Sequence, residues 1–286
     1  MGPCAGSARS AAPARSAAAS RLPPELQERL AATGLAAQSF GLYAQPVAGG
    51  APLLAWQAER VLALASTAKL VTTAATLDLL GPTFRWTTSA RLTGPLDGGR
   101  LLGDLVIVGG GDATLESAQV LAWLRQLRAA GLNEILGDIV LDRRRFQLAE
   151  ADLASTPTPA ADRPHHVRPD ALMLDGGAVH VQLQAPVGRG AARIDITPPL
   201  GAALRVVNAI QPQRGCAAEA QFRERPGSAA ELRVQGAWTP GCPTQAWQLA
   251  LLEPAELTRR AFGELWRRAS GRLGGEVREA RPADAL

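Results

Sequence analysis

Residues 62–81, LALASTAKLVTTAATLDLLG, restrict the possible folds of this 286-residue chain more than any other segment. Apolar residues recur at helical spacing from Ser66 to about Leu80, and the Gly-Pro pair that follows predicts the end of a helix. The segment also holds Lys69, the only lysine in the chain, whereas the other 29 of its 30 basic side chains are arginine. The sequence therefore predicts a helix that begins with a serine and, three residues later, with this single lysine.

Positions i and i+3 of a helix lie on one face, with Cβ atoms about 5–6 Å apart, so the Lys69 amine can reach the Ser66 hydroxyl. An unprotonated amine can take the hydroxyl proton, which a guanidinium cannot do because it stays protonated. The helix dipole disfavours the charged form of a lysine in the first turn, and the free N–H groups there can stabilise an oxyanion. This pattern predicts Ser66 as a nucleophile and Lys69 as its general base. A second interpretation stays open, in which Ser66 caps the helix and Lys69 is solvated.

The composition is that of a folded chain without a membrane span or a nucleic-acid surface. Apolar residues make up 47 % and charged residues 20 % of the chain, and no apolar run approaches the roughly 18 residues of a membrane span. Aromatic residues are only 4 % and are not interleaved with a basic stripe, so we expect no nucleic-acid partner. The net charge of +4 identifies no partner by itself.

Residues 1–22 are a low-complexity segment of Ala, Ser, Arg and Pro, which predicts either disorder or the remnant of an export segment. The stretch SAAAS resembles the small-residue cleavage region of a secretory signal, but the apolar core of such a signal is absent. Both interpretations stay open.

The rest of the chain combines helix-like and strand-like patterns, which predicts a mixed α/β (α+β) fold. Before the helix at Ser66, residues 23–35 predict a short helix and residues 39–59 a hairpin that turns at Gly49 and Gly50. The patterns further along predict strands over residues 85–94, 98–112, 135–142, 171–186, 192–199, 204–210, 231–238 and 245–254, helices over 116–131 and 254–270, and a long loop over 151–169. The C-terminal residues 274–286 are charged and show no packing pattern.

Two of the three cysteines are candidates for a disulfide. Cys4 lies in the low-complexity segment, while Cys216 and Cys242 are 26 residues apart and stand beside Gly and near Pro, as loop residues do. A bond between them would stabilise the fold by about 3 kcal/mol, and only in an oxidising compartment. Two unrelated free thiols are the other interpretation.

Three further motifs give weaker indications of a binding site. The stretch VGGGDAT follows a strand but lacks the Gly-Lys-Ser/Thr end of a phosphate loop. His165 and His166 have no acidic or cysteine cluster at metal-ligand spacing, so we expect no metal and no cofactor. The run Arg143, Arg144 and Arg145 predicts a solvated edge, with a contact to an anionic wall polymer as the alternative.

Four ordered segments resemble a known family: ALASTAKLVTTAATLDLLGPTFRWTT, LLGDLVIVGGGDATL, ILGDIVLDRRRF and VRPDALMLDGGAVHVQL. Over about residues 35–280 they resemble the class C low-molecular-mass penicillin-binding proteins, the D-alanyl-D-alanine carboxypeptidase/endopeptidases of bacterial cell-wall metabolism. The resemblance implies a transpeptidase/β-lactamase-like domain, interrupted by a large strand-rich insertion just after the Ser-x-x-Lys helix. Residues 23–85 would be the N-terminal part of that domain, residues 86–260 the inserted α/β region, and residues 261–286 the return toward the first domain.

The resemblance also implies a chemistry and a set of partners. Ser66 would attack the carbonyl between two D-alanines of a peptidoglycan stem peptide, with Lys69 as general base, and a covalent acyl-enzyme would form and be hydrolysed. β-Lactams would acylate the same serine, and the location would be the periplasm. Asp142 and Phe146 match a family motif near the active-site cleft, which implies that they contact substrate.

The chain departs from the family in its remaining motifs. Ser-x-Asn and Lys-Thr-Gly do not occur in it, and no second lysine is available. In the family that second cation helps keep the first amine neutral, and the strand after it supplies part of the oxyanion hole and of the substrate-carboxylate site. We therefore expect a C-terminally truncated member that turns over substrate poorly or not at all. The rival hypothesis is a non-catalytic module that binds peptidoglycan or a partner, with Ser66 as a helix cap.

Overall fold

The computed structural model describes residues 21–149, 163–185, 191–223, 230–282 and 284. The chain forms two compact units, which we call unit 1 (Met1–Phe84) and unit 2 (Arg85–Leu286), and each is described by itself. Most of the segment that predicts disorder or an export remnant, and residues 151–162 of the long loop, lie outside the described residues.

Unit 1 contains the elements that the sequence predicts for it. They are α1 (Pro24–Ala32), β1 (Leu42–Ala44), β2 (Leu54–Trp56), the 3-10 turns η2 (Ala37–Ser39) and η3 (Ala65–Thr67), and α2 (Ala68–Leu80). β1 and β2 form an antiparallel hairpin, and both Gly49 and Gly50 of the turn adopt positive φ, which only glycine does without strain. Gly81, at φ 76°, ends α2 where the sequence predicts the stop.

Unit 1 buries almost none of its apolar side chains. Among its described residues only Leu22 is buried, and α2 has no buried residue at all. The large apolar side chains that α2 exposes are Leu70, Val71, Leu77, Leu79 and Leu80. The 13-residue helix therefore has no tertiary packing of its own in this unit, and a helix of that length is marginal in water without it.

Unit 2 is built around two four-stranded sheets, in the orders β16-β8-β6-β3 and β15-β7-β5-β4. Their strands are β3 (Ser89–Leu92), β4 (Leu96–Asp97), β5 (Arg100–Leu101), β6 (Leu105–Val108), β7 (Glu134–Ile135), β8 (Ile139–Asp142), β15 (Arg272–Leu273) and β16 (Val277–Glu279). β6, β8 and β16 are parallel, and β3 pairs antiparallel with β6. The central strands β6 and β8 are buried almost throughout, which explains their continuous apolar runs.

Carboxylates join the successive parallel strands. Asp104 accepts the backbone N–H of Asp138 at 2.7 Å, and Asp138 accepts the N–H of Glu276 at 3.0 Å. The prediction that residues 274–286 lack a packing pattern is wrong for β16. A three-residue strand is too short to show a period, and the partner of Glu276 lies 138 residues away in the sequence.

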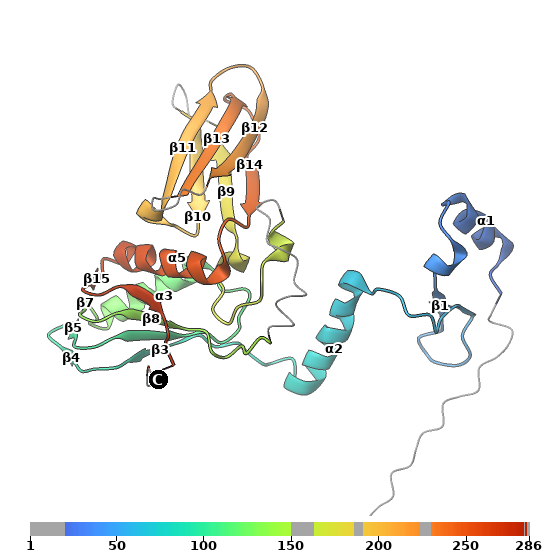
Figure 1. Ribbon diagram of the computed structural model, residues 1–286, viewed down its shortest axis with the longest axis horizontal. Helices are drawn as coiled ribbons and strands as arrows, with labels where there is room; N and C mark the ends of the chain where they lie inside the picture. The colour runs from blue at the N-terminus through green and yellow to red at the C-terminus, as the bar shows by residue number, and fades with distance from the viewer. Residues whose placement is uncertain (1–20, 150–162, 186–190, 224–229, 283, 285–286) are drawn as a thin grey trace, which may run out of the picture. The chain divides into compact units, whose positions relative to one another are not determined.

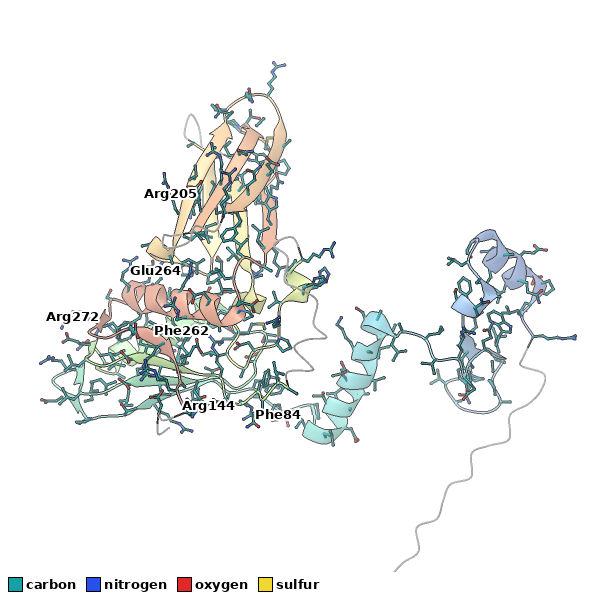
Figure 2. The ribbon with its side chains drawn as sticks, in the orientation of Figure 1. Phe84, Arg144, Arg205, Phe262, Glu264 and Arg272 are labelled. Carbon is teal, nitrogen blue, oxygen red and sulfur yellow. A yellow bond between two sulfur atoms is a disulfide. The ribbon has the colours of Figure 1, made fainter. Side chains whose placement is uncertain are left out.

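The helices α3 (Ser117–Ala129) and α5 (Pro254–Arg268) pack together against these sheets (Figure 1). Figure 2 shows Phe262 and Glu264 on opposite sides of α5. Phe262 is fully buried and belongs to the same apolar core as Leu124 of α3 and Ile139 of β8. The apolar side of α5 therefore closes the core of unit 2.

Two three-stranded sheets complete unit 2, in the orders β10-β9-β14 and β11-β13-β12, and Figure 1 shows them across α5 from β8. Their strands are β9 (Val179–Gln184), β10 (Arg193–Thr197), β11 (Leu204–Gln211), β12 (Cys216–Arg223), β13 (Ala230–Trp238) and β14 (Gln245–Leu249). The sequence pattern misses β12 because its Ala, Glu and Gln residues have weak strand propensity. The short turns η4 (Pro164–His166), η5 (Asp175–Gly177) and η6 (Gly201–Ala203) connect these elements.

The mixed α/β fold class is confirmed by this arrangement. The assignment of residues 23–85, 86–260 and 261–286 to parts of a transpeptidase-like protein stays a prediction. In the structure, residues 261–286 belong to unit 2, where β15 and β16 pair with β7 and β8.

Candidate active site

Ser66 is the middle residue of the turn η3, which ends directly before Ala68, the first residue of α2. The preceding Ala65 has a φ of 46°, a left-handed conformation that costs energy for any residue with a Cβ. Strained backbone of this kind often accompanies functional positions, because surrounding contacts must hold it in place. The unusual conformation thus immediately precedes the predicted nucleophile.

Ser66 and Lys69 are brought together. The Lys69 Nζ donates a hydrogen bond to the Ser66 Oγ at 3.0 Å, so both side chains lie on the same face of the turn that starts α2. Neither η3 nor α2 has a side-chain cap hydrogen bond, and the neighbouring Thr67 hydroxyl donates to the carbonyl of Leu64 instead. The contact of the Ser66 hydroxyl is therefore with the lysine and not with the helix end, which is the geometry that proton transfer needs.

Both members of this pair are solvent-exposed in unit 1. The pair can move a proton between hydroxyl and amine, but it supplies no donor for an oxyanion and no group that orients a substrate. The roles of Ser66 and Lys69 stay predictions, and the remaining chemistry must come from other groups.

Asp142 is the last residue of β8, at the carboxyl end of two parallel strands, and it is 8 % exposed. Arg144 holds its carboxylate: Nε donates to Oδ1 at 3.0 Å, Nη2 donates to Oδ2 at 3.1 Å, and the Arg144 backbone N–H donates to Oδ1 at 3.0 Å. These side-chain hydrogen bonds lower the pKa of Asp142 below its ordinary value, against burial, which raises it. Asp142 is therefore an ionised carboxylate whose two oxygens are both occupied.

Phe146 is half-buried four residues further on, and its ring lies against Gly111. A Cβ placed on Gly111 would be 2.9 Å from Cζ of Phe146 and 3.4 Å from the Trp86 ring, and Gly111 has a φ of 91°. Only glycine tolerates both the close approach of the Phe146 ring and the positive φ at this position. Asp142 thus ends β8 and Phe146 lies in the segment that follows it, both in unit 2, while Ser66 and Lys69 belong to unit 1.

The arginine run 143–145 is not simply a solvated edge, because its first member is mostly buried. Arg143 donates to Glu279 at 2.6 Å, to Asp170, and to the carbonyls of Leu172 at 2.9 Å and Ala255 at 3.1 Å. Its side chain is 13 % exposed, against 45 % for Arg144, and Arg145 is exposed. Three identical residues therefore have three different environments, which sequence reasoning could not distinguish.

Cys216 and Cys242 form a disulfide, with their Cα atoms 5.5 Å apart. Cys216 is the first residue of β12 and not a loop residue, and Cys242 lies in the connection between β13 and β14. The bond therefore joins an edge strand to the loop that follows its neighbour.

The described residues contain no group of three or more His, Cys, Asp and Glu side chains arranged to hold a metal ion. The rings of His165 and His166 pack edge to face. None of the described helices is both long enough and apolar enough to span a bilayer.

Comparison with solved structures identifies the fold. The chain is similar to penicillin binding protein 4 (dacB) from Haemophilus influenzae, with a TM-score of 0.61 and 18 % identity over 86 % of this chain and 54 % of that one. A second structure of that protein, complexed with a β-lactam, matches with a TM-score of 0.55 and 18 % identity over 86 % of this chain and 52 % of the other. The fold is thus that of a low-molecular-mass penicillin-binding protein, and the chain spans about half the length of these structures.

The family model described as D-Ala-D-Ala carboxypeptidase 3 (S13) matches residues 22–285. The chain belongs to this family, which confirms the resemblance seen in its four ordered segments.

Proposed function

We propose that this chain carries the nucleophile and general base of a serine-type D-Ala-D-Ala carboxypeptidase/endopeptidase of peptidoglycan metabolism. The observation that supports this most directly is the 3.0 Å contact from the Lys69 Nζ to the Ser66 Oγ. Family membership over residues 22–285 supports the substrate class, because the family is named for hydrolysis of the D-Ala-D-Ala bond.

The proposed reaction has two steps. Lys69, unprotonated, takes the hydroxyl proton as the Ser66 Oγ bonds to the carbonyl carbon between the two D-alanines; that proton then passes to the leaving amine as the C–N bond breaks. Water attacks the resulting ester, a proton returns to Oγ, and the shortened peptide leaves. A β-lactam would form the same ester through opening of its ring.

Nucleophile and base alone do not complete such a site. The chain has no Ser-x-Asn or Lys-Thr-Gly motif and no second lysine, so it lacks the groups that in this family would hold the oxyanion and the substrate carboxylate. We propose that residues 1–286 by themselves are acylated slowly and turn over substrate poorly or not at all. We also propose that Asp142 and Phe146 contribute to the substrate site, and that the protein acts in the periplasm, where a disulfide persists.

Labelled penicillin and intact-mass spectrometry test the proposal. We expect a single covalent adduct on the wild-type chain, no adduct on Ser66→Ala, and an unchanged adduct on Ser39→Ala, an exposed serine of the same unit. Lys69→Arg should slow acylation by about 10²-fold or more, because a guanidinium cannot accept the proton. An adduct that persists in Ser66→Ala refutes the assignment.

The rival function, a non-catalytic peptidoglycan- or partner-binding module, makes a different prediction. It requires that no adduct forms even in a longer protein that includes Ser-x-Asn and Lys-Thr-Gly. The Ser66–Lys69 contact, together with the missing side-chain cap, favours the enzyme.

A further inference from the structure

A polar cavity of about 480 Å³ lies in unit 2, between the segment that leads into α3 and one face of the sheet β10-β9-β14. β9 is the central strand of this sheet (Figure 1). Val179, Val181 and Leu183 of β9 are buried in the core, so the alternate residues His180 and Gln182 lie on the opposite face, where they line the cavity. The described lining of the cavity contains none of the residues assigned to the reaction.

The strand register places three polar side chains in one row across this face, which we call the polar row. His180 pairs with Thr197 of β10 on one side and with Gln248 of β14 on the other. Residues that pair in this way lie on the same face of a sheet, and neighbouring strands are about 4.8 Å apart, so the row extends over about 10 Å. Gln182 lies on the same face two residues further along β9 and adds a second carboxamide to the cavity.

The polar row has hydrogen-bonding capacity that the protein does not use. Gln182, Thr197 and Gln248 are exposed, and within the part of the chain that the structure describes their side chains make no hydrogen bond. The His180 Nε2 donates to the carbonyl oxygen of Asp175 at 3.1 Å, so the ring is held in place and Nδ1 can accept. A carboxamide and a hydroxyl can each both donate and accept. The row therefore suits a ligand that has several hydroxyl or amide groups.

The opposite wall of the cavity disfavours a charged ligand. Its carboxyl groups are Glu116 and Asp175, and none of the described lining residues is an arginine or a lysine, so an anion has no cationic partner. Asp175 is also closed to a cation, because its Oδ1 accepts the Ser117 N–H at 3.2 Å and its Oδ2 is buried. The apolar residues of this wall are Ala113, Leu115 and Ala118. The cavity therefore favours an uncharged ligand with both polar and apolar groups.

Asp175 holds the two walls together. Its N–H donates to the Leu115 carbonyl at 2.9 Å, while its own carbonyl accepts from His180 on β9. It makes these contacts at a φ of 49°, a left-handed conformation that persists only where surrounding contacts hold it. A site whose walls are fixed before binding loses less conformational entropy when a ligand enters.

We propose that this cavity binds an N-acetylated sugar, with the hydroxyl and amide groups of the sugar on the polar row and the acetyl methyl against the apolar wall. Sugar hydroxyls both donate and accept, as the side chains of the row do, and an acetamido group combines an amide with a methyl. The inference rests on the proposed function in one respect, because the glycan strands that carry the stem peptides are built from N-acetylated sugars. The cavity would then bind the glycan part of the polymer whose peptide part Ser66 is proposed to cleave.

Three matched tetrasaccharides, titrated into the whole 286-residue chain by calorimetry, test the proposal. They are the β-linked tetramers of N-acetylglucosamine, of glucosamine and of glucose, which differ only in an acetamide, an ammonium or a hydroxyl group on each ring. We expect the acetylated tetramer to bind about tenfold more tightly than either of the others, because it gains an amide hydrogen bond and buries a methyl group.

Variants of the two glutamines locate the sugar. Gln182→Ala and Gln248→Ala should each weaken binding of the acetylated tetramer about fivefold, as the loss of one hydrogen bond would, and the double variant should weaken it more than tenfold. Gln126→Ala is the matched control, since Gln126 is an exposed glutamine of α3 outside the cavity, and it should stay within twofold of wild type. Thermal unfolding of each variant establishes that it is folded.

Three results overturn the proposal. The first is no heat of binding for the acetylated tetramer at concentrations up to about 10 mM. The second is binding of the glucosamine or the glucose tetramer as tight as that of the acetylated one, which would show that the acetamide is not recognised. The third is wild-type affinity in the double variant, which would mean that the sugar binds elsewhere.

The penicillin adduct on Ser66 is read separately, so the two proposals fail independently. Sugar binding without an adduct refutes the proposed enzyme and leaves the sugar site standing. An adduct without sugar binding refutes the sugar site and leaves the enzyme standing.

Discussion

Replacing Arg143 by methionine is the most informative perturbation of the fold around the proposed substrate loop. Methionine keeps most of the side-chain stem, so the change removes the guanidinium but little packing. The guanidinium donates to two carboxylates, Asp170 and Glu279, and to two backbone carbonyls. It therefore joins the loop after β8 to α5 and to β16.

The magnitude follows from how exposed these partners are. Arg143 and Asp170 each have a side chain that is 13 % exposed, so removing one leaves a buried, unpaired charge, which costs about 3–5 kcal/mol. Glu279 is 42 % exposed and adds little as an ion pair. We therefore expect Arg143→Met to lower the free energy of unfolding by about 3–4 kcal/mol in total. This loss corresponds to a drop in Tm of about 10 °C for a unit of this size.

The pH dependence of the loss provides a second check. Burial raises the pKa of Glu279 above its ordinary value near 4.5, and the charge of Arg143 opposes that rise. A carboxyl group whose pKa is raised by folding stabilises the folded state below the pKa that it has in the unfolded chain. This contribution to the free energy of unfolding is lost as the pH rises through the pKa of the folded state. Without Arg143 the pKa rises further, so the variant should lose more stability at pH 7 than at pH 4.

Thermal and urea unfolding, followed by circular dichroism, measure both effects, with Arg145→Met as the exposed control that should cost less than about 0.5 kcal/mol. A drop in Tm under about 3 °C for Arg143→Met, or a loss that grows on acidification, would refute this account of Arg143.

Two further predictions concern local geometry and the crosslink. Gly111→Ala should destabilise unit 2 by about 1–3 kcal/mol in urea unfolding, because the new Cβ would meet the Phe146 ring at a φ of 91°. Gly34→Ala, also at positive φ but with nothing within 4 Å, should cost less, and equal losses would show that the contact with Phe146 is unimportant. Replacing Cys216 and Cys242 together by alanine should lower the unfolding free energy by about 3 kcal/mol, and a loss below 1 kcal/mol would contradict that loop-closure estimate.

The features that the sequence predicts well are those whose signals are local. The helix beside Ser66, its end at Gly81, and the proximity of Ser66 to Lys69 all follow from spacing within a few residues, although the α-helix begins at Ala68, after a 3-10 turn that contains Ser66. The hairpin turn at Gly49 and Gly50 is local in the same sense. Such features depend on the chain's own geometry and need no distant partner.

The features that it does not predict depend on distant partners. β16 is a strand because it pairs with β8, far away in the sequence, and nothing in its three residues requires that. Partners that are distant in the sequence also explain why the three arginines 143–145 differ in burial. Arg143 is buried because Asp170 and Glu279 meet it, whereas Arg144 folds back on Asp142 two residues away. Residue type alone cannot distinguish these environments, since the difference lies in what the fold brings near each side chain.

The two units differ in how firmly they hold the groups assigned to the reaction. Asp142 ends a strand of a sheet with a closed apolar core, whereas Ser66 and Lys69 lie where the helix α2 begins, and none of the residues of α2 is buried. Their 3.0 Å contact requires that the first turn is helical, and a 13-residue helix is marginal in water without tertiary packing. Acylation of Ser66 should therefore speed up with any surface that covers the apolar side chains of α2. The population of this helix would then limit the rate of acylation, in addition to the missing Ser-x-Asn and Lys-Thr-Gly motifs.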